Sequence, residues 1–307
     1  MKESPLVSVI IPTYSRPVFL SRCINSVLEQ TYPNIELIVV DDNNPDTDAR
    51  RETEKTMTGY KEDPRVTYLQ HEKNRNGSAA RNTGWRVSKG KYITFLDDDD
   101  EIAKEKIEKQ VACLESLDDS WGMCYTGYRL IKEHGHNQIS SEKRSGNCYM
   151  DALMRTMFMG SGSNLLLRKS VVDEICGYDE TFQRNQDIEF LTRACEHYKI
   201  AYVDEVLLTI YQEGNRTVRT FEQLDGYTRH YLEKFESRIK SLEPRDRERV
   251  LAVISLERFR VSLLRKKPVS GITILRDNHV KLKYITRYVR YLFRRRITHE
   301  SYGFDGK

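Results

Sequence analysis

The sequence predicts an α/β fold in which helices cover both faces of a mixed, mainly parallel sheet, followed by a helical C-terminal extension. Three observations lead to this prediction. In the N-terminal half, short runs of β-branched and aromatic residues alternate with segments of helical periodicity. Clusters of polar residues follow several of these runs, and from about Gly226 onward only helical periodicity remains. A chain of 307 residues has room for one large α/β domain with an appendage.

Four runs predict buried strands, and helical segments separate them. The strands are expected at residues 6–11, 35–40, 66–69 and 92–96. After the first strand, apolar residues at helical spacing predict a helix that ends before Tyr32. The carboxyl ends of parallel strands meet at one edge of the sheet, where ligands bind in this architecture. The polar residues that follow the strands are therefore candidate binding residues.

Four consecutive aspartates, residues 97–100, follow the last of these strands. Carboxylate oxygens suit Mg²⁺ or Mn²⁺, which usually share them with substrate phosphates. The alternative is a solvated acidic turn that opens a helix at Ile102, since negative charge suits a helix N-terminus. The run thus predicts either a metal site or a capped helix.

The motifs after the strands resemble those of the family 2 glycosyltransferases, which have the GT-A fold. The likeness covers about the first 215 residues, in the order of the family. It rests on five motifs, which are residues 9–14, 40–43, 77–84, 95–100 and the region that holds 177–182 and 186–187. One such motif is weak evidence, but five in order are specific. The resemblance implies transfer of a sugar from a nucleotide-sugar, expected to be a UDP-sugar, to an acceptor hydroxyl. It also implies inversion at the anomeric carbon and Mn²⁺ or Mg²⁺ as cofactor.

The same resemblance assigns a set of residues to the donor nucleotide. They are Pro12, Thr13, Tyr14, Arg16, Asp41, Arg81 and Asp98. Asp41 matches the position that hydrogen-bonds the uracil edge, and Asp98 matches a ribose contact. Two of these assignments keep an ordinary alternative. Asp41 and Asp42 could end the strand as a plain turn, and Arg81 could form a structural salt bridge.

The resemblance also assigns the metal ligand and the base. Asp99 matches the metal ligand, with Asp97 and Asp100 as supporting residues or as the helix cap. An inverting transfer needs one base at the acceptor oxygen, and Asp187 matches that position of the family. Asp187 is expected to open a helix, so a simple N-cap is its alternative. Glu189 is a rival carboxylate, on another side of that helix.

Residues 159–164 and Gln186 are expected beside the acceptor and the donor sugar. Gly160, Ser161 and Gly162 would line this region, because glycines let the backbone approach a ligand closely. The alternative is a flexible linker into a strand. The family often carries a histidine on a segment like residues 211–217, and none occurs here. A third protein ligand for the metal therefore has no candidate in that segment.

The C-terminal part predicts helices at residues 227–242 and 245–266 and a basic amphipathic helix within 279–297. No acidic residue occurs between Asn278 and His299. An anionic membrane surface is the expected partner of this last helix. Its apolar stripe comprises Leu282, Ile285, Val289, Leu292 and Phe293, and Tyr284, Tyr288 and Tyr291 would lie at the membrane interface. Alternatively the stripe packs on the catalytic domain. Nucleic acid is not an expected partner, because no recognised module accompanies the charge.

The predicted organisation is a catalytic domain over residues 1–225 and a helical extension over 226–307. Within the first, residues 1–115 would bind the nucleotide-sugar and 116–225 the acceptor. The predicted function is synthesis of a surface polysaccharide or related glycan on a glycan or lipid-linked acceptor. The expected location is the cytoplasm or the inner face of the cell membrane, because the sequence shows neither an apolar span nor a signal peptide.

Two rival functions come from other classes. A nucleotidyltransferase would also need a nucleotide-binding α/β half and acidic metal ligands, but the loop at residues 12–16 lacks the usual glycines. A non-catalytic relative could bind a glycan or a membrane through the basic C-terminus. The presence of both Asp99 and Asp187 argues against the second rival.

Overall fold

The computed structural model describes residues 4–133, 136–212 and 218–306, and the chain divides into two compact units. The first comprises Met1–Cys148 and Met159–Glu213, and the second comprises Tyr149–Phe158 and Gly214–Lys307. This division differs from the predicted boundary after residue 225. Helix α8 (Phe221–Lys234) begins earlier, because Thr220 and Gln223 form a capping box that starts it.

The first unit contains nine strands, one short 3₁₀ turn and six helices within the described residues. The strands are β1 (Val7–Thr13), β2 (Ile35–Asp41), β3 (Val66–Gln70), β4 (Tyr92–Phe95), β5 (Glu101–Ile102), β6 (Trp121–Lys132), β7 (Gln138–Ser140), β8 (Leu166–Arg168) and β9 (Lys199–Gln212). The helices are α1 (Pro17–Leu28), α2 (Asp48–Thr58), α3 (Gly77–Val87), α4 (Lys106–Glu115), α6 (Lys169–Glu174) and α7 (Gln186–His197), and the turn is η1 (Gly162–Asn164).

The strands form one mixed sheet with the order β3-β2-β1-β4-β8-β6. β1 pairs in parallel with β2 and β4, β2 pairs in parallel with β3, and β6 pairs in parallel with β9. β8 is antiparallel to both of its neighbours, and β5 is antiparallel to β9. The predicted mixed, mainly parallel sheet and its four predicted strands are therefore confirmed.

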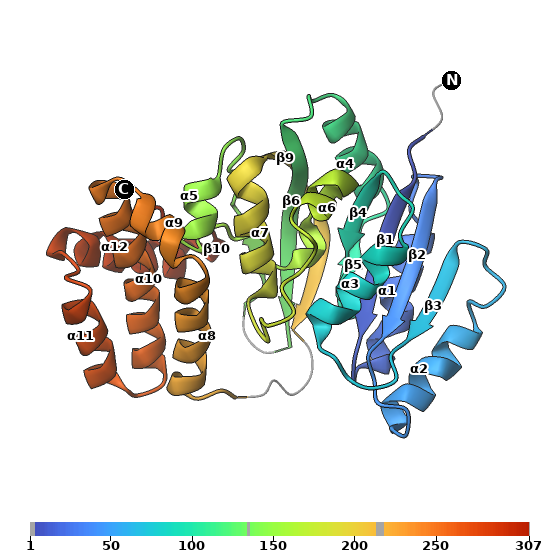
Figure 1. The fold of residues 1–307 in the computed structure, drawn as a ribbon, viewed down its shortest axis with the longest axis horizontal. Coiled ribbons are helices and arrows are strands. Elements are labelled where there is room, and N and C mark those ends of the chain that lie inside the picture. The colour runs from blue at the N-terminus through green and yellow to red at the C-terminus, as the bar shows by residue number, and fades with distance from the viewer. Residues whose placement is uncertain (1–3, 134–135, 213–217, 307) are drawn as a thin grey trace. The chain divides into compact units, whose positions relative to one another are not determined.

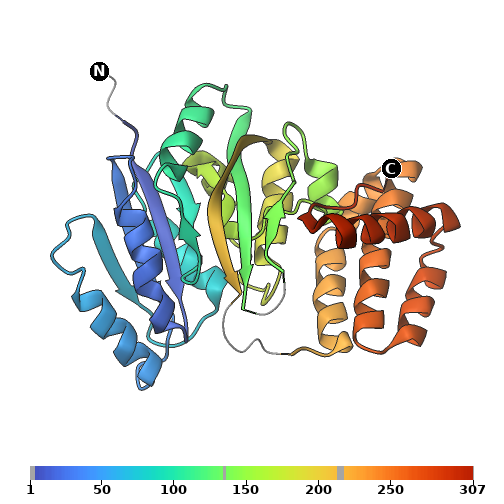
Figure 2. The same cartoon turned by 180° about the vertical axis from the view of Figure 1, so that it is seen from behind.

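Helices cover both faces of this sheet, as predicted. Alternate residues of β1, such as Val9, pack in one apolar core with α1, α2 and α4. The other face of β1 carries Ile10, which packs against Gly84 of α3. On that face Phe95 of β4 contacts Phe190 of α7. Figure 1 shows α3 and α7 in front of the sheet, and Figure 2 shows α1 and α4 in front of its opposite face.

The alternative of a helix opening at Ile102 is wrong. Glu101 and Ile102 instead form β5, where Ile102 lies opposite Leu208 of β9. Helix α4 begins only at Lys106, with Glu105 at the N-cap position. The strand pairing with β9 thus separates the aspartates from the helix that follows them.

The second unit is helical. It contains α5 (Tyr149–Leu153), α8, α9 (Glu236–Ser241), α10 (Pro244–Leu264), α11 (Pro268–Asp277), α12 (Leu282–Thr298) and the short β10 (Glu300–Ser301). Helices α8, α11 and α12 all contact α10, and both views show α8, α10 and α11 side by side (Figures 1 and 2). Within the described residues, no helix is long and apolar enough to cross a membrane.

The prediction that the three tyrosines of α12 lie at a membrane interface is wrong, because all three are buried in the protein. Tyr288 donates to a carboxylate oxygen of Glu257 on α10 at 2.6 Å, and Tyr291 donates to the backbone carbonyl of Tyr302 at 2.7 Å. The helix rests on its tyrosine face. Of its predicted apolar stripe, Leu282, Val289 and Phe293 point outward and, with Ile297, are 60–71 % exposed, whereas Ile285 and Leu292 are half-buried.

Candidate active site

The loop after β1 meets the aspartate run, because β1 and β4 are parallel neighbours. Thr13 Oγ1 donates to Asp98 Oδ2 at 2.7 Å. Arg16 forms an ion pair with Asp98 Oδ1 at 2.6 Å and a second one with Asp99. One guanidinium therefore bridges two successive carboxylates.

The two carboxylates differ in their environment. The Asp98 side chain is fully buried, whereas 22 % of the Asp99 side chain is exposed. Burial raises the pKa of Asp98 to about 7 although Arg16 opposes the shift, and the negative charge of Asp99 adds to it. Asp99 is thus the more accessible of the two carboxylates.

Asp100 is buried beneath the turn η1. Its Oδ2 accepts from Ser161 Oγ at 2.9 Å and from Ser163 Oγ at 2.6 Å. Ser163 Oγ also accepts from the backbone N–H of Asp97 at 3.0 Å. Burial and the neighbouring Asp97 hold the pKa of Asp100 well above its usual range. The alternatives of a solvated acidic turn and of Asp100 as a helix cap are therefore both wrong.

Asp187 is the second residue of α7, and Asn185 takes the N-cap position with no side-chain cap bond. Burial, with the charge of Asp97, raises the pKa of Asp187, although a backbone N–H of the helix opposes the shift. A Cβ built on Gly162 would lie 3.5 Å from Asp187 Cβ. The turn η1 thus lies against Asp187 on one side and bonds the aspartate run on the other.

The rival carboxylate Glu189 is fully buried and pairs with Arg193 one turn along the helix. Both of its oxygens accept from that guanidinium, at 2.5 and 2.8 Å. Arg193 in turn donates to the backbone carbonyl of Gly177 at 2.8 Å. Glu189 therefore fastens α7 to the preceding loop, on a different side from Asp187.

Arg81 forms a salt bridge with Asp97, which was the alternative to its predicted role at the donor nucleotide. The guanidinium carbon also lies 5.3 Å from the ring centre of Tyr178. A Cβ on Gly77 would approach both Arg81 and the Gln186 amide nitrogen, the latter at 3.9 Å. Arg81 and Gln186 therefore gather at the N-terminus of α3, beside the aspartate run.

Asp41 lies opposite Thr13 in the register of β1 and β2, and its carboxylate is fully buried. It accepts from Tyr68 Oη at 2.6 Å and from Asn43 Nδ2 at 2.8 Å, and it pairs with Arg50 at 3.0 Å. In this structure the side chain therefore fastens the end of β2 to its neighbours.

Asp42 is also buried and holds the next loop. Its carboxylate accepts from the backbone N–H groups of Arg75 and Asn76 at 2.8 and 2.9 Å and lies 2.7 Å from His71 Nδ1. The two aspartates end the strand, as a turn would. They also join the carboxyl end of β2 to the segment that opens α3.

The remaining predicted residues lie on the same edge of the sheet. Pro12 is buried within β1, while the Tyr14 side chain just after it is 49 % exposed. Gly160 has a φ of +89°, and a Cβ there would overlap Ile210 and lie 3.0 Å from Tyr128. A side chain is therefore excluded at Gly160 both by conformation and by space.

Several residues of the site escape prediction from the sequence. Arg22 donates to the backbone carbonyl of Asp99 at 3.1 Å and lies 3.7 Å above the ring of Tyr211. Ser163 of the turn η1 donates to Asp100, and Lys106 of α4 donates to the carbonyl of Ser163. A signal existed only for Ser163, which lies within the expected segment 159–164.

The residues present fit a hard divalent cation shared with a substrate. The donor atoms are all carboxylate oxygens, and Asp99 is partly exposed. The described part of the chain contains no cluster of three or more potential metal ligands. Mg²⁺ and Mn²⁺ are commonly held by one or two carboxylates with substrate phosphates, which suits this arrangement. Most of the segment where a histidine was sought, residues 213–217, lies outside the described residues.

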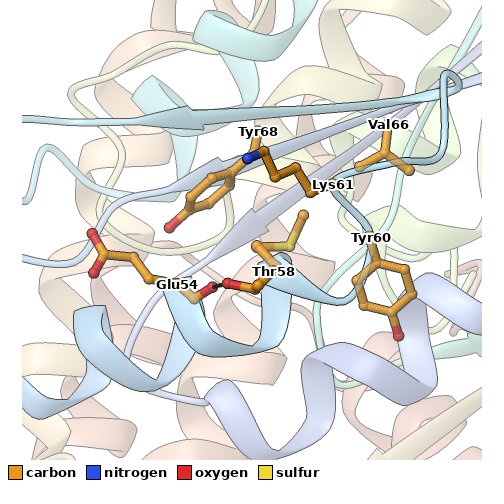
Figure 3. A pocket seen from close by; sticks show the side chains of 7 residues that line it. Glu54, Thr58, Tyr60, Lys61, Val66 and Tyr68 are labelled. Atoms are coloured by element: carbon orange, nitrogen blue, oxygen red, sulfur yellow. Dashed lines mark hydrogen bonds between the residues drawn. The ribbon is translucent and has the colours of Figure 1, made fainter.

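A separate cavity of about 380 Å³ lies between α2 and β3 (Figure 3). It is lined by Glu54, Met57, Thr58, Tyr60, Lys61, Val66 and Tyr68. None of these is a predicted donor or acceptor residue. The cavity reaches the site only through Tyr68, whose hydroxyl bonds Asp41.

Comparison with known proteins bears on the identity of this fold. Among curated relatives, an uncharacterized glycosyltransferase of Rickettsia prowazekii, RP339, is 32 % identical over 229 residues, which are 73 % of this chain and 70 % of that protein. The putative teichuronic acid biosynthesis glycosyltransferase TuaG of Bacillus subtilis is 37 % identical over 131 residues, 43 % of this chain and 50 % of that protein. The chain spans a smaller share of some other relatives, such as 29 % of a Rickettsia bellii glycosyltransferase.

Solved structures share the fold at lower identity. TarS 1–349 of S. aureus, in complex with UDP-GlcNAc, has a TM-score of 0.68 at 18 % identity and covers 98 % of this chain and 95 % of that one. The mannosyltransferase PcManGT of Pyrobaculum calidifontis, in complex with GDP-Man and Mn²⁺, has a TM-score of 0.58 at 17 % identity, covering 90 % and 76 %. The model of the family described as "Glycosyl transferase family 2" matches residues 8–176. The chain belongs to glycosyltransferase family 2, it has the GT-A fold, and it is a transferase.

Proposed function

We propose that this glycosyltransferase moves a sugar from a UDP-sugar to an acceptor hydroxyl with inversion at the anomeric carbon, using Asp187 as the base. One observation carries the proposal. The turn η1 lies against Asp187 through Gly162 and accommodates Asp100 through two serine hydroxyls. A donor-side group of carboxylates and an acceptor-side carboxylate therefore share one edge of the sheet, as a single displacement requires.

Asp187 is suited to take the proton of the acceptor hydroxyl. Its raised pKa makes it a stronger base than an exposed aspartate, while the backbone N–H of Ile188 and Arg81 oppose the shift. In an inverting transfer the acceptor oxygen attacks from the face opposite the leaving diphosphate. The base therefore has to lie on the acceptor side, within reach of the acceptor hydroxyl.

The donor nucleotide would be held by the residues around the end of β1. Thr13, Arg16 and Asp98 are linked by hydrogen bonds or ion pairs, which would present a rigid surface to the ribose. Pro12, Tyr14, Asp41 and Arg81 would complete the donor site. The complexes of TarS with UDP-GlcNAc and of PcManGT with GDP-Man support a nucleotide-sugar as donor. They differ in nucleobase and in sugar, so the choice of a UDP-sugar is part of the proposal.

Asp99 would hold the divalent cation, Mn²⁺ or Mg²⁺, together with the donor diphosphate. The cation would neutralise the negative charge that develops on the departing nucleoside diphosphate. Arg16 pairs with Asp99 in this structure, so a cation at Asp99 would share that carboxylate with the guanidinium. The Mn²⁺ complex of the mannosyltransferase PcManGT supports a metal in this fold.

Gly160, Ser161, Gly162 and Gln186 would lie beside the acceptor and the donor sugar. The proposed acceptor is a glycan or lipid-linked glycan of a surface polysaccharide, and the similarity to the putative teichuronic acid biosynthesis glycosyltransferase TuaG supports this class. Family membership argues against the nucleotidyltransferase. The presence of both Asp99 and Asp187 argues against the non-catalytic relative.

We further propose that the protein works in the cytoplasm and at the inner face of the cell membrane, through α12. The exposed stripe of Leu282, Val289, Phe293 and Ile297 provides apolar area. Exposed arginines flank it, and no acidic residue lies between Asn278 and His299. Such a face suits anionic headgroups and the acyl region beneath them.

The proposed reaction is tested by calorimetric titration with UDP, UDP-sugars and GDP-sugars, with and without Mn²⁺. We expect metal-dependent UDP binding by the wild type, lost in Asp99→Ala. Glu54→Ala, in the cavity beside α2, serves as the matched control and should bind like the wild type. Absence of nucleotide binding by the wild type in every condition would contradict the proposal.

A further inference from the structure

The turn η1 has a second set of contacts, with helix α4. The carbonyls of Ser163 and Asn164 point toward α4 and accept hydrogen bonds from two of its side chains. These are Lys106, in the first turn of the helix, and Gln110, one turn later. Both residues are completely buried.

Lys106 is held by few partners for a buried ammonium group. Its Nζ donates to Gln110 Oε1 at 2.8 Å and to the carbonyl of Ser163 at 3.2 Å. Burial lowers the pKa of Lys106 to about 8, which reflects the unfavourable environment of the charge. A lysine is rarely placed in such a position when an apolar residue would fill the space equally well.

Gln110 uses both ends of its amide. Its carbonyl oxygen accepts from Lys106, and its nitrogen donates to the carbonyl of Asn164 at 3.0 Å and of Cys124 at 3.2 Å. Cys124 belongs to β6. Gln110 therefore ties the turn to the sheet as well as to the helix.

Asn164 completes the attachment from the turn itself. Its side-chain nitrogen donates to the carbonyls of Thr126 at 2.7 Å and Met159 at 2.9 Å. Its side-chain oxygen accepts from the backbone N–H of Thr126 at 3.1 Å. The turn is thus hydrogen-bonded to α4, to β6 and to Met159 just before it.

We propose that Lys106 and Gln110 are positioning residues for the proposed transfer reaction. They hold the carbonyls of Ser163 and Asn164, and the turn in consequence holds Asp100 and stands against Asp187 at a fixed separation. Neither side chain would touch substrate. The inference rests on the proposed function, since it assigns a role in spacing the donor-side and acceptor-side carboxylates.

The test compares Lys106→Met and Gln110→Met, which keep the length of the side chain but remove its hydrogen bonds. Val111→Ala is the matched control, because Val111 is buried on the same helix but its side chain packs in the apolar core. Transfer kinetics, UDP affinity and thermal unfolding are measured on the full chain. Hydrogen exchange of the amides at residues 161–165 provides a readout that needs no activity.

For both methionine variants we expect kcat to fall about 10- to 100-fold, because a displacement of the order of 1 Å between reacting groups has effects of this size. The donor KM and UDP affinity should stay within about threefold, and exchange at 161–165 should accelerate. Val111→Ala should lose comparable stability but keep kcat within about twofold.

Three results would overturn the assignment. They are an unchanged kcat in both variants, a loss of kcat matched by Val111→Ala, and unchanged exchange at residues 161–165. If Lys106→Met does not fold, Gln110→Met alone decides the question. A wild type without UDP binding or transfer would instead overturn the proposed function, while the exchange data would still report whether the two side chains hold the turn.

Discussion

Neighbouring aspartates of the run have different surroundings, and this decides what each can do. Asp98 is buried against Thr13 and Arg16, Asp99 is partly exposed, and Asp100 is buried beneath two serines. In a turn of extended and bent residues, successive side chains point in different directions, so one carboxylate can be accessible while its neighbours are not. Four identical letters in the sequence therefore stand for separate roles.

Replacing Asp187 by Asn should remove transfer while sparing donor binding. Amide and carboxylate have nearly the same shape, but the amide cannot accept the acceptor proton, so kcat should fall by about 10²- to 10⁴-fold. Steady-state kinetics with calorimetric UDP titration measure both effects. Glu189→Gln is the control. It weakens the ion pair with Arg193, so it should lower the free energy of unfolding but leave kcat nearly unchanged. Wild-type turnover in Asp187→Asn would make the base assignment wrong.

The buried ammonium of Lys106 should make stability depend on pH in the alkaline range. Its pKa is about 8 in the folded protein, against about 10.4 for an exposed lysine. Between these values the unfolded chain binds more protons, so the free energy of unfolding should rise with pH, by up to about 1.4 kcal/mol per unit. Below about pH 8 this slope disappears.

Urea unfolding of the wild type and of Lys106→Met between pH 7 and 9.5 measures this contribution. Buried tyrosines and cysteines also titrate at alkaline pH, and the difference between the two proteins removes their effect. Lys109→Met is the control, because Lys109 lies on the same helix in solvent-accessible surroundings. Parallel pH curves for wild type and Lys106→Met would contradict the expected shift.

At the scale of elements, the strands that end in polar motifs could be predicted from the sequence, and the long paired strands β6 and β9 could not. β1, β2 and β4 are short apolar runs followed at once by polar residues. β6 and β9 are longer, and their burial changes along their length, so polar and apolar residues mix. Their pairing holds bulges between Trp121 and Tyr128, which interrupt the alternation that reveals a strand.

The residues of the candidate site also divide into those that the sequence predicts and those that it does not. Its carboxylates could be placed because they stand directly after predicted strands, or open a predicted helix. Lys106 and Gln110 could not, since on an amphipathic helix a lysine and a glutamine predict a solvent-exposed face. Their burial follows from the contacts of both side chains with the turn η1, which join residues more than 50 positions apart, and of Gln110 with β6.

Helix α3 should tolerate no side chain at Gly84. A Cβ there would overlap Ile10 Cγ2 of β1 and lie 3.3 Å from its Cγ1. Gly84→Ala should therefore lower the free energy of unfolding by about 1–3 kcal/mol despite the better helix propensity of alanine. Denaturant unfolding of Gly84→Ala, Ile10→Ala and the double variant measures the coupling between them.

In the double variant the two losses should be less than additive, because the smaller residue 10 makes room for the new methyl group. Gly226→Ala is the control, since nothing lies within 4 Å of a Cβ at that helical position. There alanine should be neutral or stabilising by up to about 1 kcal/mol. Strictly additive effects at residues 10 and 84 would show that the close approach is relieved elsewhere.

At the scale of the whole molecule, the two units have different surfaces. The first presents its polar residues at the carboxyl edge of the sheet, whereas the second exposes an apolar stripe on α12 beside arginines. The sequence predicted the stripe but assigned the tyrosines to the same interface. Tyr284, Tyr288 and Tyr291 lie on the opposite side of the helix and are buried, and the hydroxyls of Tyr288 and Tyr291 donate hydrogen bonds to Glu257 and to the carbonyl of Tyr302.

The exposed face of α12 should bind anionic membranes. In sedimentation with vesicles of phosphatidylcholine containing about 30 % phosphatidylserine, the full chain should pellet, and binding should weaken as salt screens the arginines. Val289→Ser with Phe293→Ser should reduce binding at least tenfold, since each buried apolar side chain contributes about 1.5–3 kcal/mol. Val269→Ser with Ile272→Ser is the control, because these residues are equally exposed on α11. Binding unaffected by the α12 changes, or no binding to anionic vesicles, would contradict the proposed membrane surface. A dimer in solution that the same two changes dissociate would identify a second copy of the chain as the partner instead.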